Sequence, residues 1–167
     1  MINYRLQVSV KEHLPWVEYI VDFGWVSESG IWCYVINRQQ DRAAIVYIPI
    51  SSFMPLDETP MDSVIDLTGS MQVLHQWDSP YWIPVTHSIH FLDAESAKHV
   101  EFIMTMTAPN HHEHLFHINA QLDGETLVTQ LTSGDWNVST SGIDVDVKNK
   151  LIYFQGMFSL MNSCIFL

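Results

Sequence analysis

Short runs of β-branched and aromatic residues, separated by turn-forming residues, recur along the whole chain and constrain its fold more than any other feature. The longest example is residues 131–156, which read as a turn, a Trp-led strand, a hairpin and a return strand that ends near Phe154. Between Ile143 and Val147, apolar residues alternate with aspartates, as expected for a strand with one buried face. No helical period persists long enough to predict a helix. The pattern therefore predicts an all-β fold.

Four strands of one antiparallel sheet are expected in the first half of the chain. Before them, residues 2–10 alternate between apolar and polar side chains without a break, which predicts a half-buried strand. Residues 51–70 are rich in turn formers and predict a surface excursion. The four apolar runs assigned to the sheet lie at residues 17–26, 31–36, 43–50 and 71–77.

The pattern then restarts, with runs at residues 86–92, 100–106, 114–119 and 125–132, and it restarts again at Trp136. Units of four strands that repeat every ~40 to 50 residues are typical of propeller blades. A β-sandwich also contains many short strands. The pattern alone leaves both architectures open.

The composition excludes a disordered chain and argues against nucleic acid or a membrane as a partner. With 47% apolar and 12% aromatic residues in 167, the chain is long and apolar enough for a folded core. Its formal net charge of -12 repels phosphate backbones and anionic lipid surfaces, so neither nucleic acid nor a membrane is expected as a partner. A binding site for cationic ligands is a weaker interpretation, because the acidic residues are scattered and mostly lie in predicted turns.

The two cysteines, Cys33 and Cys164, are too few and too far apart for a disulfide framework. The chain begins without a signal-peptide pattern and contains no apolar run long enough for a membrane helix, so we expect a cytoplasmic protein. Cys164–Leu167 has the form of a prenylation box, but no basic patch precedes it. Asn137 begins a glycosylation sequon, which we interpret as a chance triplet in a strand.

The densest group of histidines is His111, His112, His114 and His117, with Glu113 among them. On a strand, His114 and His117 point to opposite faces, whereas His112 and His114 share one. A metal site needs three or four converging ligands, and no cysteine or second histidine pair completes this set. We therefore predict a solvated hairpin tip, with no metal and no other cofactor.

Serine, histidine and aspartate are frequent, but no serine lies on a recognisable nucleophile elbow, so independent hydrolysis is not expected. The tryptophans lie near strand starts. We predict that they pack between blades, although a ligand pocket is the alternative. They are Trp16, Trp25, Trp32, Trp77, Trp82 and Trp136.

A family resemblance favours the propeller. Leu131–Val138 (LTSGDWNV), followed by Lys150–Gly156 (KLIYFQG), resembles the N-terminal propeller of the dipeptidyl peptidase IV family, in particular its cytosolic branch, dipeptidyl peptidases eight and nine. The further matching segments, in the same order as in that branch, are Val17–Ile20, Gly24–Trp25, Asp41–Arg42, Glu101–Ile103 and His114–Phe116.

The resemblance implies a partial propeller of about two and a half four-stranded antiparallel blades over residues 1–156, with a divergent tail at residues 157–167 that resembles a truncated end. The parent enzyme would be a serine-type dipeptidyl peptidase that releases N-terminal dipeptides ending in proline or alanine. In that family, the catalytic triad lies in a separate hydrolase domain, with its serine in a Gly-x-Ser-x-Gly elbow. That motif and the family's substrate-binding Glu-Glu pair are both absent here. We therefore expect no catalytic residue in this chain, and a peptide substrate only within the full-length enzyme.

An open propeller exposes strand edges that ring closure would hide. We expect these edges at residues 2–10 and at Leu151–Phe154, and they predict marginal stability and a tendency to self-associate. One alternative function is a non-enzymatic interaction module, a short isoform or paralogue that binds through such an edge. Another is a metal-dependent enzyme built on the histidine cluster.

Overall fold

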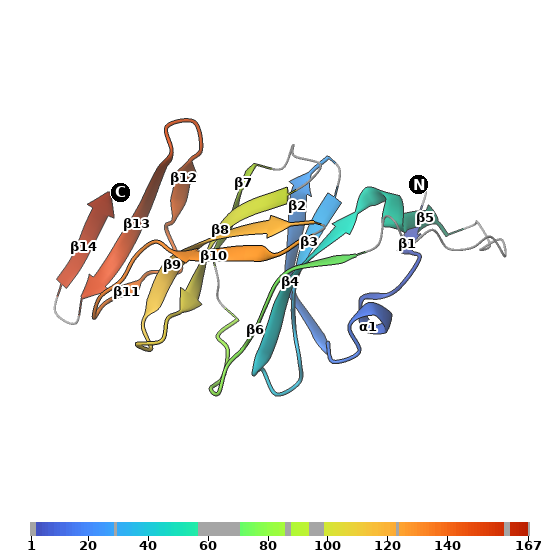
Figure 1. Ribbon diagram of the computed structural model, residues 1–167, viewed down its shortest axis with the longest axis horizontal. Helices are drawn as coiled ribbons and strands as arrows, with labels where there is room; N and C mark the ends of the chain where they lie inside the picture. The colour runs from blue at the N-terminus through green and yellow to red at the C-terminus, as the bar shows by residue number, and fades with distance from the viewer. Residues whose placement is uncertain are drawn as a thin grey trace. The chain divides into compact units, whose positions relative to one another are not determined.

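The structure is a computed structural model that describes residues 3–28, 30–56, 71–85, 88–93, 99–122, 124–158 and 161–166. Antiparallel sheets make up nearly all of it, which confirms the all-β prediction and is consistent with a partial β-propeller (Figure 1). The chain divides into two compact units, Met1–Ile83 and Pro84–Leu167.

The first unit contains the predicted four-stranded sheet, in the order β2-β3-β4-β6. Its strands are β2 (Tyr19–Ser27), β3 (Gly30–Ile36), β4 (Arg42–Pro49) and β6 (Gln72–Asp78). The turn between β3 and β4 is held by Asn37, whose side-chain oxygen accepts hydrogen bonds from the backbone N–H groups of Asp41 and Arg42, each at 3.1 Å. This local bond fixes the hairpin that the sequence predicts.

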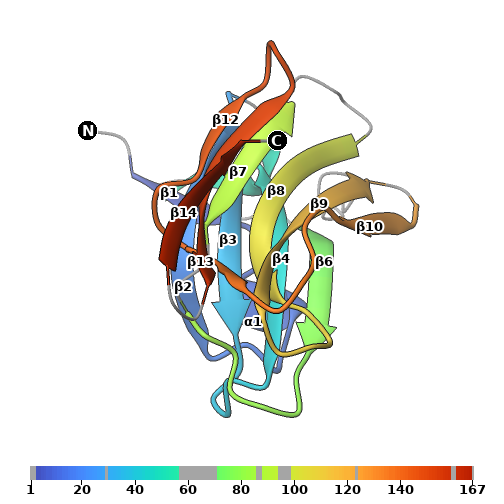
Figure 2. The same cartoon turned by 90° about the vertical axis from the view of Figure 1, so that its left-hand side faces the viewer.

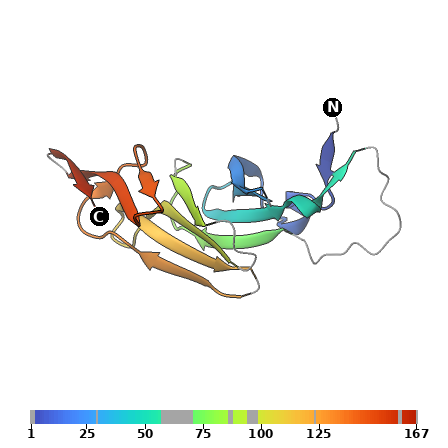
Figure 3. The same ribbon diagram turned by 90° about the horizontal axis from the view of Figure 1, so that it is seen from above.

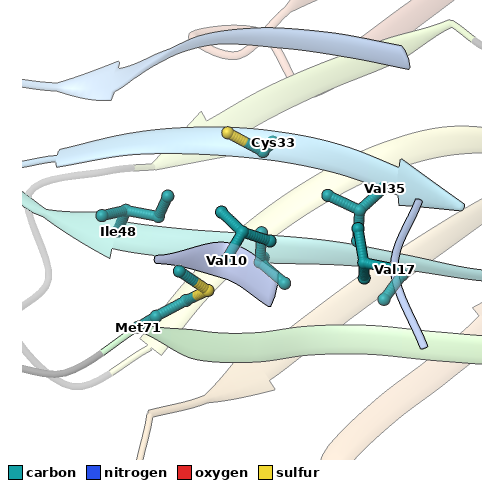
Figure 4. Close-up of a cluster of buried hydrophobic side chains, with 8 residues drawn as sticks. Val10, Val17, Cys33, Val35, Ile48 and Met71 are labelled. Carbon is teal, nitrogen blue, oxygen red and sulfur yellow. The ribbon is translucent and has the colours of Figure 1, made fainter. Parts of the chain in front are cut away.

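One face of this sheet carries a hydrophobic core cluster of the first unit. Val35, Ala44 and Val46 are fully buried there, and Val10 packs on them from outside the sheet (Figure 4). Cys33 lies in the same cluster, and burial raises the pKa of its thiol to about 11. A thiol with this pKa stays protonated and unreactive at neutral pH. Cys33 is therefore part of the packing.

The prediction of one strand over residues 2–10 is wrong. Among the described residues of this segment, Tyr4–Leu6 form the short strand β1, and helix α1 (Val10–His13) follows it. Ser9 caps the helix: its hydroxyl accepts a bond from the Glu12 backbone N–H, and the Glu12 carboxylate accepts one from the Ser9 backbone N–H. This capping box satisfies backbone donors that would otherwise be unpaired. It therefore favours a helix at residues that the apolar–polar alternation assigned to a strand.

Beyond β4 the chain turns back to the N-terminal segment. A 3-10 helix, η1 (Ile50–Ser52), leads into β5 (Phe53–Pro55), which pairs with β1 in a two-stranded sheet (Figure 3). The surface excursion expected at residues 51–70 therefore begins with a paired strand. The part of it from residue 57 to 70 lies outside the described residues.

The second unit contains the second predicted sheet, in the order β10-β9-β8-β7 (Figure 2). Its strands are β7 (Ile89–Asp93), β8 (His99–Thr107), β9 (Glu113–Gln121) and β10 (Thr126–Gln130). Strands β8 and β9 are mostly buried, whereas β10 is exposed along most of its length. This sheet confirms the first restart of the pattern.

The third sheet is built on a central strand, β13 (Leu151–Phe158). Two short strands, β11 (Asn137–Val138) and β12 (Asp144–Asp146), pair with successive parts of it, and β14 (Met161–Phe166) pairs with it as well. The described residues of the tail, 157–158 and 161–166, therefore continue this sheet.

Both segments that the sequence predicts as open edges have partner strands in the structure. Tyr153 pairs with both Asp144 of β12 and Phe166 of β14, whereas Leu151 and Ile152 pair with β12 and Phe154 pairs with β14. At the other end, β1 pairs with β5. The alternation within each segment does not reveal its pairing, because the partner strands β5 and β14 lie outside that segment.

Candidate functional site

The histidines of β9 point to opposite faces of the second sheet, as their odd spacing predicts. His114 is fully buried. Its Nδ1 lies 3.1 Å from Thr132 Oγ1 and its Nε2 lies 3.1 Å from the Gly134 carbonyl oxygen. A carbonyl can only accept, so Nε2 carries the proton and Nδ1 accepts from the Thr132 hydroxyl. Thr132 Oγ1 also accepts a bond from the Leu115 N–H. His114 therefore holds the 132–134 turn against β9 with both ring nitrogens.

The residues of this turn explain the Leu131–Trp136 motif physically. Gly134 has φ +122°, and an added Cβ would lie 2.6 Å from Trp136 Nε1, so only glycine fits. The Trp136 ring stacks on Phe154 at 6.1 Å between centroids and meets His114 edge-on at 5.2 Å. The motif thus joins β9, the turn and β13 in one aromatic cluster.

The interpretation of the histidine group as a solvated hairpin tip is wrong for His114 and correct for His111, which is exposed. His112 is half-buried, with Nδ1 3.3 Å from Asn137 Oδ1. The alternation could not reveal the burial of His114, because it depends on a turn that is distant in sequence. Among the described residues, no group of three or more potential ligands is placed to hold a metal ion.

His117, on the other face, belongs to a polar cluster centred on the Glu101 carboxylate. His117 Nε2 lies 3.4 Å from Glu101 Oε2, and His99 Nε2 lies 3.5 Å from Oε1. Asn119 donates a 2.7 Å hydrogen bond to the same Oε1. This cluster links β8 to β9 across the sheet, and the sequence analysis did not identify it.

The structure also brings together a serine, a histidine and an aspartate. Ser88 Oγ lies 2.7 Å from His90 Nε2, and Asp144 acts electrostatically on that imidazole. Burial lowers the pKa of His90, and Asp144 opposes this by raising it. A neutral imidazole can accept the serine proton. The Ser-x-His spacing was the available sequence signal, since it places both side chains on one face.

One common donor of an oxyanion hole is already engaged at Ser88. A nucleophilic serine needs hydrogen-bond donors for the oxyanion formed by its attack, and its own backbone N–H is a common one. The Ser88 N–H instead donates to Thr105 Oγ1 at 3.2 Å, while Thr105 N–H donates to the Ser88 carbonyl. These contacts attach the start of β7 to β8.

The prediction that the tryptophans pack between blades fits Trp136, whose ring contacts His114 of the second sheet and Phe154 of the third. Trp77 instead stacks on Tyr34 of its own sheet, and Trp16 lies under the Arg42 guanidinium at 5.8 Å. Trp25 and Trp82 are exposed.

Asn137 of the sequon is half-buried, and its side-chain oxygen accepts a 2.8 Å bond from the Glu113 N–H. The side chain connects the start of β11 to β9. This role fits our interpretation of the sequon as a chance triplet.

Comparison with known proteins places these features in a family. The profile of the dipeptidyl peptidase IV (DPP IV) N-terminal region matches residues 5–160. The chain belongs to this family. Human dipeptidyl peptidase 8 is 26% identical to it over 169 residues, a match that covers 84% of this chain and 19% of the relative. The mouse dipeptidyl peptidase 8 is 27% identical, with the same coverage.

A fungal relative matches a similar part of the chain. The probable dipeptidyl-aminopeptidase B of Coccidioides posadasii is 26% identical over 151 residues, which is 88% of this chain and 15% of the relative. The chain thus spans less than a fifth of the length of these curated relatives. In the part of the chain that the structure describes, no helix is long and apolar enough to span a membrane.

Proposed function

We propose that this chain is a non-catalytic propeller segment of a serine-type dipeptidyl peptidase. The parent enzyme would remove N-terminal dipeptides that end in proline or alanine, with its triad in a hydrolase domain. The observation that carries the proposal is the match of residues 5–160 to the DPP IV N-terminal region, together with three antiparallel sheets that repeat along the chain.

The geometry of the second unit supports a scaffold role. Its buried polar groups are used for holding strands together: His114 binds the 132–134 turn, and the Ser88 N–H binds Thr105. A propeller that positions a hydrolase domain must be rigid, because small displacements of reacting groups cost large factors in rate. We also propose a cytosolic location, on the basis of the resemblance to the cytosolic branch.

The test is to recover the native product from its source cells with an antibody to residues 131–156. We expect the captured protein to release p-nitroaniline from Ala-Pro-p-nitroanilide. A fluorophosphonate should label it on a serine that lies outside these 167 residues. A captured protein with neither peptidase activity nor a labelled serine would contradict the proposal. It would favour the alternative, a non-enzymatic interaction module.

A further inference from the structure

The chain contains serine and threonine hydroxyls that are followed, three residues later, by a carboxylate. Acidophilic protein kinases select this spacing, because a basic substrate groove binds the carboxylate and places the hydroxyl at the phosphate to be transferred. What each hydroxyl contacts decides which of them such an enzyme can reach. Among the described residues, the pairs with this spacing are Ser9 and Glu12, Thr132 and Asp135, and Ser141 and Asp144.

Two of the three hydroxyls are engaged in the fold. Ser9 Oγ accepts a bond from the Glu12 N–H, and the Glu12 carboxylate accepts one from the Ser9 N–H at 2.7 Å, so both groups belong to the cap of α1. Thr132 is buried, and its Oγ1 contacts the ring of His114 and the Leu115 N–H. A kinase would have to break the cap or the turn to use either hydroxyl.

Ser141 lies in the loop between β11 and β12, and it is exposed, as is Asp144. Its backbone N–H donates to Ser139 Oγ at 3.3 Å, and the two hydroxyl oxygens are 3.1 Å apart. Ile143 is buried in a hydrophobic cluster with Phe154, which anchors the loop between the two exposed residues. A phosphate on Ser141 therefore displaces no buried side chain.

The charge around Ser141 favours an enzyme with a basic groove. Residues 99–147 contain no lysine or arginine, and Asp146 adds a second carboxylate two positions after Asp144. A kinase that recognises basic residues finds none in this segment, whereas a basic groove is attracted by the segment and by the formal charge of -12. We propose that Ser141 is a phosphorylation site for an acidophilic protein kinase, with Asp144 as the residue that determines specificity.

The reaction transfers the terminal phosphoryl group of ATP to Ser141. A bond forms between Ser141 Oγ and the γ-phosphorus, the bond from that phosphorus to the bridging oxygen of ADP breaks, and the hydroxyl proton passes to the aspartate base of the kinase. The product carries about two further negative charges at neutral pH. This modification uses no peptidase activity, so it does not depend on the proposed function.

The test is to incubate the purified chain with ATP and casein kinase 2, an acidophilic kinase, and to measure the rate of phosphorylation at each site by mass spectrometry of proteolytic peptides. We expect phosphate at Ser141, none at Ser9 or Thr132, and loss of the Ser141 phosphate in Ser141→Ala. Asp144→Asn should lower the initial rate at Ser141 about fivefold, which is the loss expected when one exposed charge contact is removed.

Asp135→Asn is the matched control. Asp135 is also exposed and has the same spacing from Thr132, whose hydroxyl is buried, so this substitution should leave the rate at Ser141 unchanged. The proposal is overturned if Ser141 carries no phosphate, or if Asp144→Asn and Asp135→Asn slow its phosphorylation equally. Phosphate found only at Thr59 or Ser63, which also precede an aspartate by three residues, would overturn it too.

Discussion

His114 in the second unit and His75 in the first both have ring nitrogens shielded from water, but their surroundings differ. Both nitrogens of His114 have hydrogen-bond partners. His75 Nε2 is buried with no partner, and its ring stacks on Trp77 at 5.3 Å between centroids. His114 therefore holds the 132–134 turn through hydrogen bonds, whereas His75 acts as a packing ring whose Nε2 is unpaired.

This difference in hydrogen bonding predicts how much each buried histidine contributes to stability. A buried polar atom without a partner costs free energy, whereas a paired one stabilises the fold modestly and is costly to remove. His114 should thus resist substitution, and His75 should tolerate it. The same substitution at the two positions separates these roles.

The largest effect is expected from His114→Phe, which keeps a ring but removes both hydrogen bonds. The Thr132 hydroxyl loses its acceptor, and the Gly134 carbonyl keeps only the bond from Asn110 at 2.9 Å. We expect a loss of about 2–4 kcal/mol in the free energy of unfolding. Urea unfolding followed by tryptophan fluorescence measures it. A loss below about 1 kcal/mol would mean that His114 does not lock the turn.

Gly134→Ala tests the turn that His114 holds in place. The new Cβ would lie 2.6 Å from Trp136 Nε1 at φ +122°, so backbone strain adds to a clash and we expect a loss of about 2–3 kcal/mol. The matched control is Gly142→Ala, where φ is +77° and the nearest atom outside the adjacent residues, Gln155 Cδ, would lie 4.0 Å from the added Cβ. The control has strain without a clash and should lose only about 1 kcal/mol. Equal losses would show that Trp136 does not set the requirement for glycine.

His75→Phe should have the smallest effect at pH 7, within about 1 kcal/mol, because it removes no hydrogen bond from Nε2 and keeps the stacked ring. Its effect should depend on pH. Burial lowers the pKa of His75 in the folded state, so the unfolded state binds more protons as the pH falls below about 6.5. The stability of the wild type is then lost on acidification.

His75→Phe should therefore be more stable than the wild type at pH 5 and have a shallower fall in unfolding free energy between pH 7 and 5. His90, whose pKa burial also lowers, remains in the variant and keeps part of the slope. Parallel pH profiles for the two proteins would show that His75 is not protonated on unfolding.

The sequence predicted the strands whose neighbours lie close in the chain. The hairpin of β3 and β4 and the order β10-β9-β8-β7 follow from alternation and turn residues, which are local signals. The helix after Ser9 was also encoded locally, but in its capping box, which competed with a misleading alternation. Sequence alone could not predict the pairing of β14 with β13, because the tail has no family pattern.

The polar groups were predicted less well than the strands. Strand periodicity correctly separated the faces of His114 and His117, but it carries no information about what covers each face. The burial of His114 depends on Thr132 and Gly134, and the Ser88–His90 pair is near Asp144 only after β12 has formed. These contacts join segments distant in sequence, and local patterns do not specify them.

The most direct test of the central claim, that this chain is a non-catalytic member of a dipeptidyl peptidase family, is a peptidase assay on the purified 167-residue chain. We predict no release of p-nitroaniline from Ala-Pro-p-nitroanilide above the buffer rate, and no difference between the wild type and Ser88→Ala. Hydrolysis by the wild type that is lost in Ser88→Ala would contradict the claim and would make the Ser88–His90 pair a catalytic site.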